Sequence, residues 1–256
     1  MSRKPQENFI GSDPHEGTTR MDYFVWAIRA GEEWIVVDTG FTAAAAERRR
    51  RQHLRCPTEA LRQLGVDPEA VRDVVITHLH YDHAGNLDKF PAARFHLQQA
   101  EMAFATGPCM CEPYLRHAFD VEDVVQMVRQ VFAGRVAFHQ GDVELRPGIS
   151  LHRVGGHTDG LQVVRVHTTR GWVVLASDAT HYNANFQRRS PFPIVYHVGD
   201  MLNGYDRLRM LADSDDHIVP GHDPEVLADY PTHEGNMEIV ALHQVSKARV
   251  GRPREG

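Results

Sequence analysis

The sequence predicts a mixed α/β (α+β) fold in which two β-sheets pack face to face and helices cover the outside. Short apolar runs, typical of buried strands, recur along the 256 residues, and helical segments stand between them. Hydrophobic residues make up 42% of the chain, which is enough for a sizeable core. No repeat of fixed period divides the chain, so we expect a single domain over residues 1–256.

The first half of the chain predicts strands that alternate with helices. Residues 1–20 are polar and are expected to form an N-terminal arm. A short connection with a Gly joins the first two strands, which predicts a hairpin. The basic run at 48–51 is expected to be a solvated face, with a contact to an anionic group as the alternative. The expected elements are strands at 23–28 and 34–37, helices within 42–64 with a new start at Pro57, strands at 74–76 and 93–97, and a helix at 98–105.

The second half begins with an insertion at 106–134, which ends in an amphipathic run from Val121 to Phe132. Turn residues then separate a group of strands that we assign to a second half-sheet. Residues 246–256 are polar and basic and are expected to form a flexible tail. The expected elements are strands at 135–138, 149–154, 161–168 and 171–176, a helix at 200–211, a strand at 216–219 and a helix at 234–245.

Four potential metal ligands, His78, His80, Asp82 and His83, stand within six residues at the end of the strand at 74–76. Imidazole and carboxylate groups suit zinc and similar divalent ions. His78 and His80 fall on one side of an extended backbone, whereas Asp82 and His83 follow the turn and can face a second point. The spacing therefore favours two metal sites over one tetrahedral site. A His-rich surface loop is the alternative, because the chain holds 17 His.

Three further candidate ligands appear downstream, each in a Gly-rich turn or just after a strand-like run. His157 stands in a Gly-Gly-His-Thr turn, Asp178 follows the apolar run at 172–176, and His222 stands in a Pro-Gly-His-Asp turn. Seven ligands are enough for two metals, with three His at one, an Asp and two His at the other, and one bridging carboxylate.

These motifs resemble the metallo-β-lactamase-fold hydrolases, and within them the quorum-quenching N-acyl-homoserine lactonases and their lactonase relatives. The resemblance runs from about Tyr23 to His222, and it implies an αββα sandwich in which Asp38, Thr39 and Gly40 lie beside the metal loop. The residues that carry it are 78–85 (HLHYDHAG), 141–148 (GDVELRPG), 155–158 (GGHT), 177–179 (SDA) with Asn185 and Phe186, and 221–223 (GHD).

The resemblance also implies a role for each ligand and a hydrolytic reaction. Two zinc ions are expected, with other divalent metals as open alternatives. Two cations about 3.5–4 Å apart lower the pKa of a shared water, so that hydroxide can attack the carbonyl carbon of a lactone. Asp82 is the candidate for moving a proton to the leaving oxygen. The implied sets are His78, His80 and His157 for the first metal, Asp82, His83 and His222 for the second, and Asp178 as the bridge.

The chain departs from the lactonase pattern three residues after the bridging Asp. Lactonases of this group commonly carry there a Tyr that supports the substrate carbonyl, whereas this chain has His181, with Tyr182 next to it. Either residue can take that catalytic role, or the role is absent. We expect an apolar wall of the substrate pocket from the insertion and from the loop at 181–199, with packing of the outer helices as the alternative. The candidate substrate-binding residues are Phe104, Met110, Tyr114 and Phe192.

Other functions of the same fold remain open. They include an ester or thioester hydrolase, such as a glyoxalase II-like enzyme or a catabolic lactonase, and a single-iron oxygenase like the persulfide dioxygenases. The complete second ligand set argues against a single iron. A net charge of −6 argues against a nucleic-acid binder. The expected partner is a small lactone or ester, and a homodimer is compatible with the sequence.

Composition and the N-terminus set the expected compartment. The sequence contains no run of about 18 apolar residues, so no membrane partner is expected. The N-terminus lacks the apolar core of a signal peptide, and three Cys do not suggest a disulfide framework. We therefore expect a cytoplasmic protein.

Overall fold

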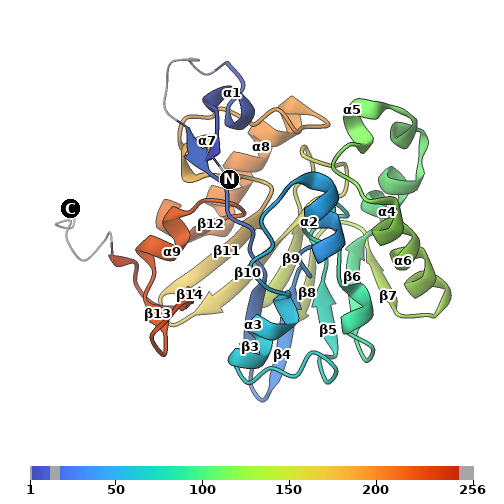
Figure 1. The fold of residues 1–256 in the computed structure, drawn as a ribbon. Helices are drawn as coiled ribbons and strands as arrows, with labels where there is room; N and C mark the ends of the chain where they lie inside the picture. Colours follow the sequence, from blue (N-terminus) through green and yellow to red (C-terminus); the bar gives the residue numbers. More distant parts are fainter. Residues whose placement is uncertain (1, 12–17, 248–256) are drawn as a thin grey trace.

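The structure, a computed structural model, describes residues 2–11 and 18–247 (Figure 1). Two five-stranded sheets form its centre, and helices flank them. This is the αββα arrangement that the sequence predicts. Residues 248–256 of the predicted tail lie outside the described residues.

The first sheet has the strand order β3-β4-β5-β6-β7. The pair β3–β4 is an antiparallel hairpin, as predicted, and the other neighbours are parallel. Parallel neighbours place their carboxyl ends at one edge, so the loops after them can meet there. The strands are β3 (Trp26–Ala30), β4 (Glu33–Val37), β5 (Asp73–Val75), β6 (Arg94–Gln98) and β7 (Val136–His139).

The second sheet has the order β12-β11-β10-β9-β8. Its neighbours are antiparallel except for β11 and β12, which run parallel with a register shift between Leu175 and Ser177. The strands are β8 (Val143–Arg146), β9 (Ile149–Arg153), β10 (Gln162–Thr168), β11 (Gly171–Ser177) and β12 (Ile218–Pro220).

Three of the helices in the described chain illustrate starts at residues that favour them. The Thr42 side chain accepts a hydrogen bond from Ala45 N, the Asp120 side chain accepts one from Glu122 N, and Pro57 occupies the first turn of its helix. The α-helices are α1 (Pro5–Asn8), α2 (Ala43–Arg49), α3 (Pro57–Gln63), α4 (Gln99–Thr106), α5 (Pro113–Arg116), α6 (Val121–Phe132), α7 (Asn183–Gln187), α8 (Val198–Leu211) and α9 (Glu225–Asp229). The 3-10 helices are η1 (Leu87–Lys89), η2 (Pro108–Cys111) and η3 (Asp215–His217).

Three buried clusters fill the three interfaces between the four layers. Along β4, Val36 faces helices α3, α4 and α6, whereas Ile35 and Val37 face the other sheet. Along β11, Val174 packs against α8 and its neighbours in the chain face the first sheet. Adjacent apolar side chains thus point to opposite faces, which explains why these strands read as unbroken apolar runs.

Two predictions about the strands are wrong. The strand predicted at 135–138 is β7, which pairs with β6 in the first sheet, because α6 crosses over the sheet and returns the chain parallel to β6. The helix predicted at 234–245 is instead a hairpin of β13 (Thr232–His233) and β14 (Asn236–Val240). Glu234 and Gly235 both have positive φ, which suits the two-residue turn of a hairpin.

The N-terminal arm has more structure than the sequence predicts. β1 (Ser2–Arg3) pairs with β2 (Thr19–Arg20), and α1 packs near α7 (Figure 1). Ile10 N donates to Pro191 O, and the Asn185 side chain donates to Asn8 O. These contacts tie the arm to the segment that carries His181. Short polar segments of this kind give no periodic signal, because their partners lie far along the chain.

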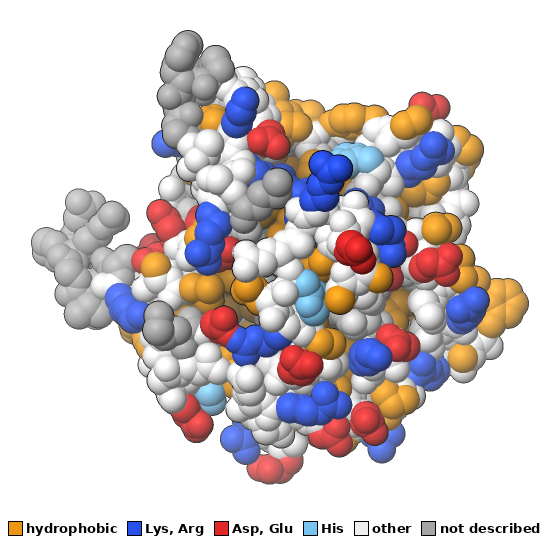
Figure 2. Space-filling model, viewed as in Figure 1, with side chains coloured by type: hydrophobic (Ala, Val, Ile, Leu, Met, Phe, Trp, Pro, Cys, Tyr) orange, Lys and Arg blue, Asp and Glu red, His pale blue; other side chains and the backbone are white. Residues whose placement is uncertain are grey.

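The face in view carries charges of both signs, and the thiols are free. Figure 2 shows acidic and basic side chains interspersed over the face in view, not a continuous basic surface. Cys56, Cys109 and Cys111 are free thiols. In the described part of the chain, no helix is both long and apolar enough to cross a membrane.

Candidate metal centre

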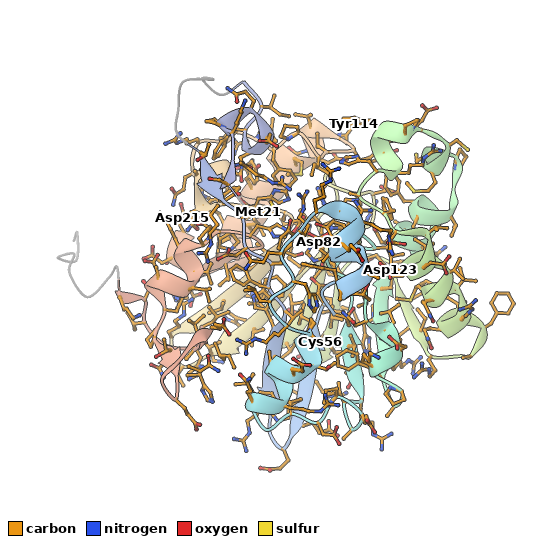
Figure 3. The ribbon with its side chains drawn as sticks, viewed as in Figure 1. Met21, Cys56, Asp82, Tyr114, Asp123 and Asp215 are labelled. Carbon is orange, nitrogen blue, oxygen red and sulfur yellow. The ribbon has the colours of Figure 1, made fainter. Side chains whose placement is uncertain are left out.

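Seven predicted ligands converge at the loops that follow the strands. Figure 3 shows Asp82 beside α2, near the centre of the molecule. The residues come from the turn after β5, the loop between β9 and β10, the end of β11 and the turn after β12. The clusters of donors within 4.8 Å of one another are His78, His80 and His157; His78, His83 and Asp178; Asp82, His83 and His222; and His157, Asp178 and His181.

The first group is formed by three imidazoles. His78 Nε2 lies 3.1 Å from His80 Nδ1, and His157 Nε2 lies 3.2 Å and 2.9 Å from these two atoms. All three rings are buried. Three ring nitrogens that point at one spot give the facial arrangement that a zinc ion can use.

The second group faces the first across Asp178. Asp82 Oδ2 lies 3.7 Å from His222 Nε2 and 3.8 Å from His83 Nε2. Asp178 Oδ1 lies 3.0 Å from His222 Nε2, and its Oδ2 lies 3.2 Å from His157 Nε2. The two carboxylate oxygens of Asp178 therefore face different groups, as a bridging ligand requires.

Other residues hold the outer nitrogens of these rings. His83 Nδ1 lies 2.7 Å from Asp38 Oδ2, His222 Nδ1 lies 2.7 Å from Asp22 O, and His157 Nδ1 lies 2.6 Å from Ile194 O. A ring nitrogen beside a carbonyl or carboxylate oxygen carries the proton, so Nε2 keeps its lone pair for a metal. Asp38 lies beside the metal loop, where it also accepts hydrogen bonds from Thr77 N and Thr77 Oγ1.

Burial and neighbouring charges divide the ligands into two kinds. Burial, with the neighbouring imidazoles, lowers the pKa of His78 and His80 well below the usual value, so both rings are neutral. Burial also acts to lower the pKa of His83 and His222, but nearby carboxylates, that of Asp178 first, outweigh it and raise both.

Burial opposes ionisation of Asp178, but the imidazoles of His222 and His83 hold its pKa well below its usual range. The centre thus joins the neutral rings of His78 and His80 to a carboxylate that stays ionised. Both are forms in which side chains bind metals.

The donor set fits divalent cations. His83 Nε2 and Asp178 Oδ1 are buried and lie 3.3 Å apart, and neither makes a well-aligned hydrogen bond within the described chain. Unpaired polar atoms in a protein interior are costly, and a cation between them would satisfy both. The imidazole and carboxylate donors suit zinc, and no thiol takes part.

Strained backbone turns direct these side chains. Asp38 and Ser177, at the ends of β4 and β11, have φ of 60° and 46°. Non-Gly residues favour negative φ, so the surrounding structure holds both turns in place. A Cβ at Gly221 would lie 2.7 Å from Ser177 O and 2.8 Å from Asp178 Oδ1. The turn before His222 can therefore approach Asp178 only because residue 221 is Gly.

The structure separates the two candidates for the catalytic position at 181–182. His181 Nε2 lies 2.9 Å from Asp178 Oδ2, and its ring stacks on Phe192. Burial lowers the pKa of His181 well below its usual value. The Tyr182 hydroxyl instead donates to Arg20 O, toward the N-terminal segment. Only His181 joins the donor cluster.

A small cavity of about 10 Å³ adjoins the three-imidazole group. Two of the predicted substrate-binding residues, Phe104 and Tyr114, line it. Met110 packs against the outer core, and Phe192 lies buried against the rings of His181 and His157. The lining residues are His80, Phe104, Tyr114, Leu115, His157, Ile194, Val195 and Tyr196.

The sequence did not reveal two sets of supporting residues. Glu101 is buried in α4 and bonds to both segments that carry the three-imidazole group. The solvated face predicted at 48–51 is confirmed for Arg48 and Arg50, which are exposed, but not for Arg49. The Arg49 guanidinium lies over the Tyr81 ring of the metal loop and donates to Phe119 O. The only signal for Glu101 in the sequence was an acidic residue within an apolar helix. The contact of Arg49 gave no such signal, because runs of Arg are usually exposed to solvent.

Comparisons with known proteins agree with this geometry. The family model described as the Metallo-beta-lactamase superfamily matches residues 18–222. An N-acyl homoserine lactonase of Bacillus sp is 29% identical over 189 residues, which are 67% of this chain and 70% of that protein. An N-acyl homoserine lactonase of Agrobacterium fabrum is 34% identical over 184 residues, 66% of this chain and 63% of that protein.

Solved structures share the fold. A quorum-quenching N-acyl homoserine lactone lactonase has a TM-score of 0.72 at 23% identity, with 88% of each chain covered. An N-acyl homoserine lactone hydrolase, solved with the product N-hexanoyl-L-homoserine at its catalytic metal centre, has a TM-score of 0.73 at 22% identity, with 88% of this chain and 90% of that chain covered.

Proposed function

The chain belongs to the metallo-β-lactamase superfamily and is a metal-dependent hydrolase, and from this we propose that it opens lactone rings with two divalent cations, zinc by preference. The observation that carries the proposal is Asp178, whose two oxygens face two separate groups of donors. The similarity to lactonases at 29–34% identity supports the lactone substrate. The product bound at the metal centre of the related hydrolase supports the same site of reaction.

Each donor group would hold one cation, and Asp178 would join the two. When bound, the cations supply an ionised water near neutral pH and stabilise negative charge on a carbonyl oxygen. Asp38, with the carbonyls of Asp22 and Ile194, keeps the ligand rings oriented. The first group is His78, His80 and His157, and the second is Asp82, His83 and His222.

Two side chains would act on the substrate. Asp82 is the most exposed of the seven donors, at 9%, so its Oδ2 can receive a proton and deliver it to the leaving oxygen. We assign the support of the substrate carbonyl to His181 and not to Tyr182, because His181 Nε2 lies 2.9 Å from Asp178 Oδ2 in the donor cluster, whereas the Tyr182 hydroxyl donates to Arg20 O.

The cavity favours a neutral substrate with an apolar chain. Apart from His80 and His157, the residues that line the cavity are aromatic or aliphatic. Among the described residues, no Lys or Arg lines it. A thioester of an anionic carrier needs cationic groups to bind its charge. The complete second donor group also argues against a single-iron oxygenase.

The test is hydrolysis of short- and long-chain N-acyl-homoserine lactones by zinc-loaded protein, followed by base uptake. We expect kcat/KM above about 10⁴ M⁻¹s⁻¹, and loss of turnover in Asp178→Asn. Asp123→Asn is the matched control, because Asp123 is also a buried carboxylate but lies in α6, outside the donor cluster. Two zinc ions bound per chain without lactone turnover would refute the substrate class and leave an ester or thioester hydrolase.

A further inference from the structure

Glu101 is a buried carboxylate that the hydrolytic chemistry does not use. It lies in the first turn of α4 with no exposed surface, and no Lys or Arg in the described ranges forms an ion pair with it. A buried charge without a cationic partner costs folding free energy unless hydrogen bonds compensate it. Its contacts therefore indicate what it does.

The two carboxylate oxygens of Glu101 hold two different segments. Oε1 accepts a hydrogen bond of 2.9 Å from Leu79 N. Oε2 accepts hydrogen bonds of 2.6 Å from Thr158 Oγ1 and 3.1 Å from Gly160 N. Three charge-assisted hydrogen bonds are a strong local restraint.

Both segments carry ligands of the three-imidazole group. Leu79 stands between His78 and His80, and Thr158 follows His157. These segments are more than 70 residues apart in sequence, yet their ring nitrogens meet within about 3 Å. Glu101 joins the two segments through Leu79 N, Thr158 Oγ1 and Gly160 N, and in the described chain it makes no hydrogen bond to any of the three imidazoles.

The close approach of the second segment to α4 depends on Gly160. A Cβ at residue 160 would lie 2.0 Å from Glu101 N, which is far inside any real contact. The second donor group has a different anchor, because Asp38 Oδ2 contacts His83 Nδ1 directly. The two groups thus depend on different buried carboxylates, although Asp38 also holds Thr77, next to His78.

We propose that Glu101 is the positioning residue of the first metal site: it sets the spacing of His78, His80 and His157 and thereby the affinity of that site relative to the second. This inference rests on the proposed two-cation function. Residues that orient ligands without touching the metal typically contribute 10- to 100-fold in metal affinity.

The experiment is a zinc titration of Glu101→Gln, followed through the imidazole ¹⁵N resonances of the protein. Gln has the size of Glu, but its amide offers a donor where the carboxylate accepts, so it cannot satisfy the backbone N–H groups of both Leu79 and Gly160. We expect zinc affinity at the first group to fall about 10- to 100-fold. Affinity at the second group, reported by His83 and His222, should change less than about threefold, in line with its separate anchor at Asp38.

A second variant and a control keep the result interpretable. Thr158→Val removes one hydrogen bond to Glu101 and keeps its carboxylate, so it should lower affinity at the first group by a smaller factor. Asp123→Asn, which changes a buried carboxylate outside the centre, should alter neither affinity. Thermal unfolding of the metal-free proteins establishes whether each variant is folded. If Glu101→Gln does not fold, Thr158→Val provides the test.

The outcomes separate this inference from the function on which it rests. Wild-type protein that binds two zinc ions, together with variants whose two affinities are unchanged or fall equally, overturns the role of Glu101 alone. Wild-type protein that binds no zinc overturns the proposed function and this inference with it. A selective fall at the first group, reported by His78, His80 and His157, supports both.

Discussion

The hydroxyl of Tyr114 closes the cavity beside the metal centre, and its removal should make substrate access easier. Tyr114 belongs to α5, and its hydroxyl donates to Pro193 O on the opposite loop. Figure 3 shows Tyr114 at the upper edge of the molecule, away from the core. The cavity beneath measures about 10 Å³, the size of a single water. Pockets that hold small organic ligands measure about 300–1,000 Å³. The cavity in this form is therefore smaller than the pockets that hold ligands of this size.

Packing indicates which side of the contact between Tyr114 and Pro193 moves, α5 or the loop that holds Pro193. The loop with Pro193 is fixed to the metal centre, because Tyr196 N and His197 N donate to Gly156 O and His157 Nδ1 bonds to Ile194 O. By contrast, η2 and α5 contain no buried residue. Segments with few buried contacts open at low free-energy cost. We therefore expect α5 to swing away from the loop.

The size of the effect follows from one hydrogen bond. A neutral hydrogen bond contributes about 0.5–1.5 kcal/mol net, so Tyr114→Phe should raise the ratio of open to closed protein about 2- to 13-fold. Apparent affinity scales with the fraction of binding-competent protein. KM for a long-chain lactone should fall by about the same factor, with kcat unchanged. The variant keeps the aromatic ring at residue 114 and loses only the hydroxyl.

Steady-state kinetics of Tyr114→Phe tests this reasoning. Tyr230→Phe is the matched control, because the Tyr230 hydroxyl also donates to a main-chain carbonyl, that of Asp216, far from the cavity. An unchanged or higher KM in Tyr114→Phe would refute the closing role of the contact.

Three further predictions concern buried carboxylates. Asp178→Asn should abolish turnover and lower the zinc content from two ions per chain, because an amide bridges two cations poorly; metal analysis after gel filtration measures this. Asp38→Asn should lower zinc affinity about 10- to 100-fold, chiefly at His83, because the amide accepts a weaker hydrogen bond from the ring; chelator competition measures it. Asp123→Asn should stabilise the protein at high pH. Burial first, then the Asp120 charge, raises the pKa of Asp123 to about 7, so the folded state holds a proton that the unfolded state releases. The wild-type protein therefore loses stability as pH rises from about 4 to 7. Urea unfolding at both ends of this window measures the effect. The free energy of unfolding of the variant should exceed that of the wild type by up to about 4 kcal/mol, and only at the upper end.

Each of these predictions has a contradicting result. Two zinc ions retained by Asp178→Asn would remove the bridging role. Equal affinities in Asp38→Asn and wild type would show that His83 needs no anchor. A stability difference in Asp123→Asn that is the same at both pH values would show that the carboxyl does not titrate in this window, because the charges of Arg48 and Arg49, which lower its pKa, outweigh burial.

The two-sheet fold and the set of seven ligands could be predicted from the sequence, because both depend on local patterns. Apolar runs mark strands, and the ligands stand directly after them, where parallel strands end at a common edge. The same local patterns misplaced β7, because a four-residue strand carries no information about its partner. They also assigned a helix to residues 236–240, where a two-residue turn with positive φ decides the pairing.

The position at 181–182 shows why side-chain direction could not be predicted. Both residues can form hydrogen bonds, and they follow Asp178 by three and four positions. Their directions depend on the positive φ of Ser177 and on the N-terminal segment, whose Arg20 carbonyl accepts the Tyr182 hydroxyl. Since that segment lies about 160 residues away, the choice between His181 and Tyr182 is made by tertiary contacts. We therefore expect changes in residues 2–11 that loosen the contact between Asn8 and Asn185 to alter the orientation of His181 without any change in the donors themselves.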